Sequence, residues 1–208
     1  MLTAHVGLAG SLLGAAALHV GWAEQADAVA QTLSDYALVD GGGRIFTGTV
    51  ICLAAGSAAL LAGLVRSGLP VGGPAKALLG AWCGGLVLTV VFPTDPAGST
   101  PSVRGLVHRY TAGGAVAALP LAGLLIARRL GVLPGWQPTA RSLRRTSWAS
   151  VAGGLAFLGA HLCATAPVTP MARSIAGGLG LAERVTFGLE TVLLFVLAGA
   201  VRASRGRR

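Results

Sequence analysis

The sequence predicts an all-α fold, a bundle of six transmembrane helices with both termini in the cytoplasm and short interfacial helices on the outer side. The chain is 53% hydrophobic and 11% charged, whereas ordinary soluble domains are about 25% charged. Its mean hydropathy is +0.71, and its apolar residues fall into six runs of roughly the 17–25 residues that span a bilayer as a helix. We expect a single domain at residues 1–201 and a basic cytoplasmic tail at residues 202–208.

The cations are distributed unequally between the loops, and this asymmetry orients the bundle. The loops on one side contain no acidic residue and carry most of the cations: Arg66, Lys76, Arg128, Arg129, Arg141, Arg144, Arg145, Arg202, Arg205, Arg207 and Arg208. Cytoplasmic loops of membrane proteins are enriched in arginine and lysine. We therefore predict a plasma-membrane protein whose basic side is cytoplasmic and contacts membrane lipids. The same asymmetry accounts for the net charge of +9, so we expect no nucleic-acid partner.

The first two predicted spans enclose a polar outer segment. Residues 2–22 form an apolar run without a basic leader, which favours a retained helix over a signal peptide. Residues 24–44 are polar, and Ser34-Asp35 is a typical cap for a short interfacial helix. The glycines at 41–43 break the chain before the second span at residues 45–65.

Prolines delimit the third and fourth spans. The third, residues 76–92, ends at two prolines that deliver Asp95 to the outer surface. Thr100-Pro101 has the pattern of an N-cap followed by the first helical residue. It begins a long helix that ends at Arg128-Arg129.

The last two spans flank a second outer segment. The fifth, residues 148–166, follows a basic loop that extends to Arg145, and Thr169-Pro170 begins another short outer helix. The sixth follows Gly177-Gly178. Glycines four apart, Gly10 with Gly14 and Gly80 with Gly84, permit close helix packing. Such motifs serve packing within one chain as well as dimerisation, so the oligomeric state stays open.

The sixth span carries the most informative polar residues. Glu183 and Arg184 lie at its outer end, and Glu190 follows seven residues after Glu183. Seven helical residues rotate by about 700°, so the two carboxyl groups share one face. A carboxylate two turns inside a membrane helix costs roughly 2.5–3.5 kcal/mol on insertion scales. We therefore expect Glu190 to face the bundle interior.

Other polar residues gather near the same membrane interface. His19, His108 and His161 lie near the outer ends of their spans, and with Glu190 they are expected within roughly 5–11 Å of that interface. The remaining members of this predicted pocket lie above them, on the extracytoplasmic side: Asp35, Tyr36, Arg44, Asp95, Arg104, Arg109, Glu183 and Arg184. Structural ion pairs among these residues are the simplest alternative explanation.

Three kinds of chemistry compete for this pocket. General acid–base catalysis needs a buried carboxyl group such as Glu190 and a neighbouring histidine. A zinc site formed by the histidines with Asp95 or Glu190 is less favoured, because no H-x-x-x-H or H-E-x-x-H pair occurs in the sequence. Haem is less favoured still, because His5 has no partner histidine at its depth. We therefore expect no metal and no cofactor.

Short motifs along the chain resemble those of a known family. They are Leu33-Ser34-Asp35-Tyr36-Ala37, Gly43-Arg44-Ile45-Phe46, Phe92-Pro93-Thr94-Asp95, His108, and Gly180-Leu181-Ala182-Glu183-Arg184-Val185. In order and placement they resemble the six-span membrane family called domain of unknown function 998. A more distant likeness is to the Frag/DRAM/Sfk membrane proteins, which are linked to lipid organisation and lipid-anchor processing.

The resemblance implies a six-helix membrane fold. It also suggests a characteristic polar set, namely Ser34, Asp35, Asp95, His108, Glu183 and Arg184. It implies no reaction, and His161 and Glu190 match none of its motifs.

These features lead to two functional hypotheses. The first is a membrane-embedded enzyme that acts on a lipid-like or isoprenoid substrate by proton transfer, such as a proton-initiated isoprenoid cyclase or a lipid hydrolase or transferase. Glu190 would be the buried acid, with His161 or His108 as its proton partner and Asp35 or Asp95 as a second carboxylate. The expected substrate-binding residues are Arg44, Arg104, Arg109, Arg184, Tyr36, Glu183 and His19. The second hypothesis is a non-catalytic protein that binds or moves a lipid or small solute, or that supports a membrane complex.

Overall fold

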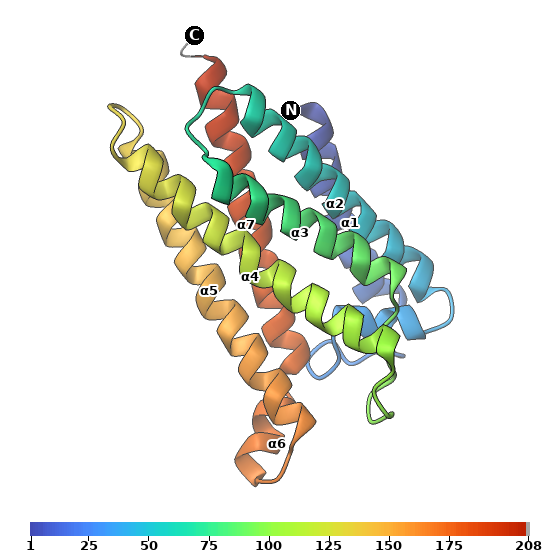
Figure 1. The fold of residues 1–208 in the computed structure, drawn as a ribbon. Coiled ribbons are helices and arrows are strands. Elements are labelled where there is room, and N and C mark those ends of the chain that lie inside the picture. Colours follow the sequence, from blue (N-terminus) through green and yellow to red (C-terminus); the bar gives the residue numbers. More distant parts are fainter. Residues whose placement is uncertain (207–208) are drawn as a thin grey trace.

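The computed structural model describes residues 1–206, which form helices and loops without any strand. Six helices are long and apolar enough to cross a membrane: α1 (Leu2–Gly21), α2 (Gly42–Arg66), α3 (Gly73–Val91), α4 (Val103–Gly131), α5 (Gln137–Thr165) and α7 (Leu179–Arg205). Both termini lie at one end of the bundle, and the short helices η1 (Leu33–Leu38) and α6 (Pro170–Ala176) lie at the other (Figure 1). The predicted six-helix fold is confirmed.

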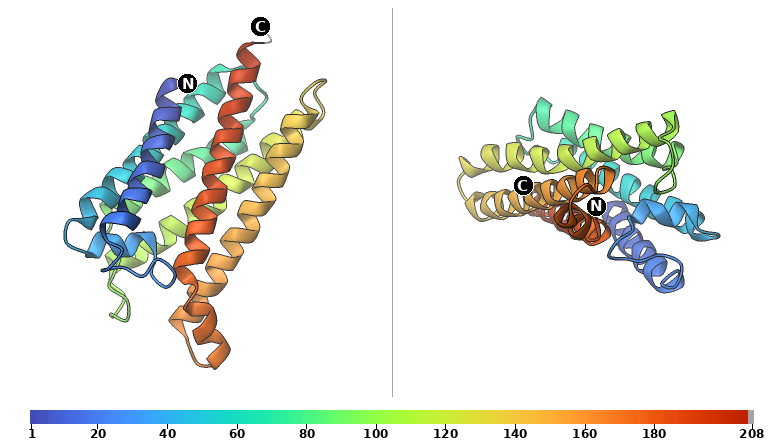
Figure 2. Two further views of the ribbon diagram at one scale, coloured as in Figure 1. Left: turned by 180° about the vertical axis from the view of Figure 1, so that it is seen from behind. Right: turned by 90° about the horizontal axis from the view of Figure 1, so that it is seen from below.

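Helix α7 occupies a central place in the bundle. It lies behind α3 and α4 in Figure 1, and the view from the opposite side shows it running between α1 and α5 (Figure 2). It contacts α1, α2, α4 and α5. The other long helices pack largely in chain order, α1 on α2, α2 on α3, α3 on α4 and α4 on α5. A residue on the inner face of α7 therefore reaches the centre of the molecule.

Close approach between neighbouring helices depends on glycine. A methyl group added to Gly7 of α1 would lie 2.6 Å from Gly56 Cα of α2, which leaves no room for a side chain. A methyl group added to Gly14 would collide with the Thr49 side chain, so the predicted packing role of its motif is confirmed. Gly80 and Gly84 instead have nothing within 4 Å, and both are exposed on α3.

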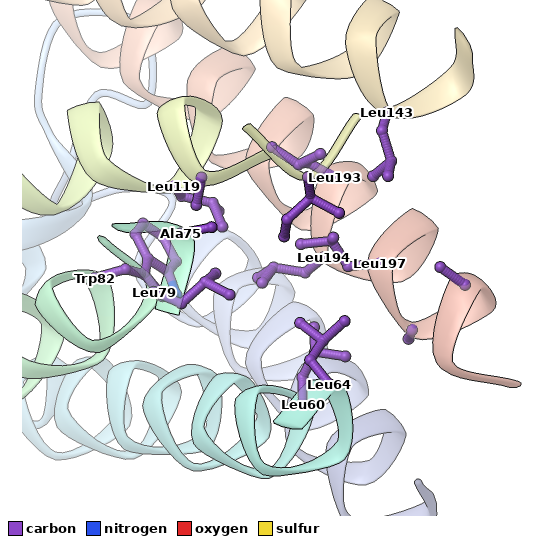
Figure 3. Close-up of a cluster of buried hydrophobic side chains, with 14 of the residues drawn as sticks. Leu60, Leu64, Ala75, Leu79, Trp82, Leu119, Leu143, Leu193, Leu194 and Leu197 are labelled. Carbon is purple, nitrogen blue, oxygen red and sulfur yellow. The ribbon is translucent and has the colours of Figure 1, made fainter. Parts of the chain in front are cut away.

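The main hydrophobic core lies toward the end that holds the termini. Leucines of α7 gather there with side chains of α2, α3, α4 and α5 (Figure 3). The labelled members are Leu60, Leu64, Ala75, Leu79, Trp82, Leu119, Leu143, Leu193, Leu194 and Leu197. The one polar atom of Trp82 is satisfied, because its indole N–H donates to Ser57 Oγ at 2.9 Å. A smaller apolar cluster around Tyr36 lies at the opposite end.

Several predicted boundaries were wrong. Helix α5 begins at Gln137 rather than near residue 148, so most of the predicted basic loop is helical. Ser102, not Thr100, caps α4 by accepting the Gly105 N–H. The predicted cap at Thr169 is confirmed by its bond from Ala172 N.

The first residues of the predicted tail belong to the last helix. Helix α7 continues to Arg205, so the tail begins as helix. Residues 207–208 of the tail lie outside the described range.

Candidate functional site

Arg184 joins three parts of the chain at the end of the bundle that holds η1 and α6, which we call the outer end. Its Nε donates to His19 Nε2 at 2.5 Å, and its Nη1 donates to the carbonyl oxygens of Gln31 at 2.7 Å and Gly180 at 2.9 Å. Its guanidinium carbon lies 5.8 Å from the centre of the Tyr36 ring, in cation–π range. A guanidinium group only donates hydrogen bonds. Arg184 therefore holds α1, the segment before η1 and α7 together.

The contact with Arg184 selects one form of His19. Because Nε2 accepts from the guanidinium, the ring proton must lie on Nδ1, which bonds the Ala15 carbonyl oxygen at 2.6 Å. His19 is thus neutral in this arrangement, and both of its ring nitrogens are engaged. His19 and Arg184, both predicted to bind substrate, therefore have a structural role in this arrangement.

Glu183 and the first turn of α7 bind the segment that precedes η1. The Leu33 N–H donates to Glu183 Oε2 at 2.5 Å, and the Leu181 N–H donates to the Val29 carbonyl oxygen at 3.0 Å. A methyl group on Gly180 would collide with the carbonyl oxygens of Gln31 and Ala28. The chain before η1 therefore packs tightly across the start of α7 and is hydrogen-bonded to it; we call this segment the strap.

Asp35 serves the start of η1. Thr32 is the N-cap, and Asp35 Oδ2 accepts from the Thr32 N–H at 2.6 Å and from its hydroxyl at 2.9 Å. The predicted cap at Ser34-Asp35 was therefore misplaced, because Asp35 is the third helical residue of a capping box. Tyr36 on the next position is fully buried, and its hydroxyl has no hydrogen-bond partner among residues 1–206.

Asp95 and His108 fasten the turn between α3 and α4. Asp95 accepts from the Ser102 hydroxyl at 2.6 Å and from the Ser102 N–H at 2.8 Å. These two bonds lower the pKa of Asp95, with smaller contributions from the charges of Arg109 and His108. His108 is buried, and its Nδ1 lies 2.9 Å from the Phe92 carbonyl oxygen and 3.0 Å from that of Thr89. Both side chains thus have structural partners.

The other predicted arginines do not converge on one point. Arg44 is exposed on α2 and lines an open hollow of about 720 Å³ beside Asp40. Arg104 and Arg109 are exposed on α4. Of the four predicted substrate-binding arginines, Arg184 is the one that is half-buried, and it is hydrogen-bonded to neighbouring segments.

Glu190 differs from the carboxyl groups of Asp35, Asp95 and Glu183 because its buried oxygen lacks a partner. The side chain is 3% exposed, and Oε1 has no hydrogen-bond partner in the described part of the chain. It lies one turn before Leu194, on the face of α7 that enters the core. The expectation that Glu190 faces the bundle interior agrees with this burial.

Close contacts fix which part of α5 lies beside Glu190. A methyl group on Gly153 would lie 3.1 Å from Leu189 Cδ1, and one on Gly123 would meet both Ser147 Oγ and Leu193. The two helices run in opposite directions (Figure 1), so Ser150 is level with Glu190. Ser147 and Ser150 are fully buried, and the structure gives neither hydroxyl a partner within residues 1–206.

The sequence analysis did not identify these two serines. Their signal was the inward stripe of α5, which repeats every three to four residues as Leu143, Ser147, Ser150, Gly154, Phe157 and His161. His161 shares this stripe, and its Nε2 is buried without a partner among the described residues. Its ring centre lies 6.4 Å from that of Phe157.

His161 and Glu190 lie at different depths. His161 is four residues from Thr165, the last residue of α5, or about 6 Å along the helix axis. Glu190 is 11 residues beyond Leu179, the first residue of α7 (190 − 179), or about 16 Å. The structure therefore places Ser150, and not His161, opposite Glu190.

No group of three His, Cys, Asp or Glu residues in the described chain is arranged to hold a metal ion. His5, considered for haem, bonds the Met1 carbonyl oxygen at 2.9 Å through Nδ1 and lies 3.2 Å from Arg202 through Nε2. The three cysteines are free and half-buried.

The comparison with family models agrees with the motifs and with the fold. A family model described as "Protein of unknown function (DUF998)" matches residues 6–200. Comparisons with curated proteins and with solved structures found no match. The family match covers nearly the whole chain and all six apolar helices. The chain is therefore a membrane protein that belongs to the DUF998 family.

Proposed function

We propose that this membrane protein binds a lipid-like or isoprenoid molecule inside its bundle and transfers a proton to it from Glu190. The observation that carries the proposal is the buried Glu190 oxygen without a partner, level with the unpaired hydroxyl of Ser150. Buried polar groups in native proteins are nearly always hydrogen-bonded. A set of unpaired groups in one seam is therefore a candidate for binding the polar end of a ligand.

The environment of Glu190 suits an acid. No cation is bound to it in the described structure, and apolar residues of α7 follow it along the same face. Charging a carboxyl group in such surroundings is costly, so the neutral, proton-carrying form is expected at rest. Transfer of that proton to an alkene or oxygen of the substrate would leave a carboxylate and a cationic substrate. The cation then loses a different proton to water as the product forms, and a proton from water returns to Glu190, so no proton is consumed overall. His161, farther out on the α5 stripe, lies toward the outer water and could serve that return path.

A specific observation also favours a non-catalytic binding role. Asp35, Asp95, His108, Glu183 and Arg184 all have hydrogen-bond partners that stabilise loops or helix ends. Two carboxylates acting together are thus not arranged around Glu190. In this second proposal Glu190, Ser150 and Ser147 hold the polar group of a bound lipid without changing it.

The test is mass spectrometry of lipids that co-purify with the protein in detergent, followed by incubation in heavy water. The wild type is compared with Glu190→Gln, which keeps the side-chain shape and removes the acid. Glu24→Gln changes the same group at an exposed position and serves as the control. Thermal melting of all three proteins checks that the bundle is intact.

Each outcome has a distinct meaning. If the wild type and the control retain a lipid and add deuterium to it, while Glu190→Gln retains it unlabelled, the acid role of Glu190 is supported. Retention by all three without deuterium uptake would refute proton transfer and favour the binding role. Absence of a retained lipid from all three intact proteins would contradict both proposals.

A further inference from the structure

A second hollow lies at the opposite end of the bundle, between α4 and α5. It has a volume of about 510 Å³, and Arg128, Arg141 and Arg144 line it together with Leu124, Ala127 and Ala140. The loop between these two helices lies toward the end that holds the chain termini (Figure 1). Neither Glu190 nor Ser150 lines this hollow, which combines a cationic rim with an apolar floor.

The positive charge of this hollow is not balanced by the chain. The sequence contains no acidic residue between Asp95 and Glu183, a stretch that includes all of α4 and α5. Arg128 is exposed near the end of α4, and Arg141 and Arg144 are exposed on successive turns of α5. An anionic group from outside the chain is needed to neutralise this site.

The floor and the neighbouring surface are apolar. Ala127 and Ala140 are buried, and Leu124 is half-buried. Trp148 lies one turn beyond Arg144 on α5 and is 58% exposed. Leu121 of α4 and Leu155 of α5 continue the exposed apolar surface toward the middle of the bundle. Tryptophan is enriched where a membrane helix meets the headgroup region.

We propose that this hollow binds one anionic phospholipid. Its phosphate would lie among Arg128, Arg141 and Arg144, and its acyl chains would follow Leu124 and Trp148 along the bundle surface. Basic pockets between membrane helices are suited to anionic headgroups, and arginine binds phosphate through paired N–H donors. A free anion would use the arginines alone, whereas a lipid also uses the apolar surface that continues from the hollow.

Other arginines at the same end of the bundle do not line the hollow. The guanidinium group of Arg129 packs over Gly72, where an added methyl group would lie 2.6 Å from its Cζ. Arg145 does not line the hollow. Arginines of the same end of the bundle thus provide a control with the same change in charge.

The test is a titration of the delipidated protein with phosphatidylglycerol or phosphatidylcholine of identical chains, followed by native mass spectrometry. The site variant is Arg128→Gln/Arg141→Gln/Arg144→Gln. The control is Arg66→Gln/Arg145→Gln/Arg205→Gln, whose residues are also exposed. A third variant, Leu124→Trp, fills the hollow and keeps every charge.

We expect the first phosphatidylglycerol to bind the wild type at least about tenfold more tightly than phosphatidylcholine, since each arginine near an anionic headgroup contributes about fivefold. The site variant and Leu124→Trp should each lose that preference, and the control should keep it. If the site variant fails to fold, Leu124→Trp decides the question.

Three results would overturn the proposal. One is equal affinity of the wild type for both lipids. Another is equal loss in the control and site variants, which would mean that overall charge alone attracts the lipid. The third is displacement of phosphatidylglycerol by excess inorganic phosphate together with normal binding by Leu124→Trp, which would identify a free-anion site.

Discussion

Gly180 offers a direct test of how the segment before η1 is held against α7. An alanine methyl group there would collide with the Gln31 carbonyl oxygen, would lie 2.9 Å from the Ala28 carbonyl oxygen and would lie 2.8 Å from Arg184 Nη1. Two of these three neighbours are backbone atoms, which cannot turn aside as a flexible side chain can. We therefore expect Gly180→Ala to shift the strapped segment and weaken its hydrogen bonds.

The size of the effect follows from the contacts. Overpacking of a tight site costs about 1–3 kcal/mol, and the helix-propensity gain from alanine, up to about 1 kcal/mol, is small at the second residue of a helix. Gly188 in the same helix has nothing within 4 Å, so Gly188→Ala should be neutral or stabilising. The two variants should differ by about 1–4 kcal/mol, or about 2–16 °C in Tm for a chain of this length.

Thermal unfolding in detergent can be followed with a thiol-reactive dye, because the three free cysteines are half-buried. Hydrogen exchange supplies a local readout at the Leu33 and Leu181 amides, which donate to Glu183 and Val29. In Gly180→Ala both amides should exchange faster. Equal melting of the Gly180→Ala and Gly188→Ala proteins, with unchanged exchange at these amides, would refute the tight strap.

Two further predictions concern polar groups with different surroundings. The bonds from Ser102 lower the pKa of Asp95 below its ordinary 3.8, so the contribution of Asp95 to stability is present above about pH 4 and is lost as the pH falls through the folded-state pKa. Between about pH 6 and about pH 3, Tm should fall more steeply in the wild type than in Asp95→Asn. Parallel plots of Tm against pH for the two proteins would contradict this prediction. Ser57→Ala should lower the free energy of unfolding by about 1–3 kcal/mol, because it leaves the Trp82 N–H unpaired in the core. Ser150→Ala removes an unpaired hydroxyl and should leave Tm unchanged or raise it. A large fall in the Tm of Ser150→Ala would mean that the Ser150 hydroxyl has a partner.

The number and order of the membrane helices were predictable because each needs a long apolar run. The start of α5 was not predictable, because residues 137–147 are mostly polar or charged and therefore carry no hydropathy signal. Helical hydrogen bonds continue there beyond the apolar run. The predicted start of the helix was the first residue of the apolar run, whereas the observed start is set by backbone hydrogen bonds that begin before this run.

The roles of the outer polar residues were harder to predict for another reason. Glu183 and Arg184 were expected to bind a substrate or to form ion pairs, but Glu183 accepts the Leu33 N–H and Arg184 donates to the Gln31 carbonyl oxygen. Backbone atoms of a loop leave no trace in side-chain patterns. The position of the loop across α7 had to come from the structure.

The depth of Glu190 was misjudged for a related reason. It was placed seven residues inside its span, whereas α7 begins four residues before Glu183, at Leu179. That shift moves Glu190 away from the outer histidines and places it level with Ser150. A small error in a helix boundary therefore changed the expected partner of a buried group.

The distinction between engaged and unpaired polar groups bears on function more than their number does. Arg184, Glu183 and Asp95 stabilise the outer loops, so their presence is explained by folding alone. The burial of Glu190 and Ser150 reduces stability, because neither has a partner that offsets the loss of water. A bundle of this kind would be held together at least as well by leucine and alanine at the same two positions. Groups that lower stability and lie together in one seam are better explained by what they bind or do than by what they support. For that reason we propose that Glu190, rather than the larger outer polar cluster, carries the function.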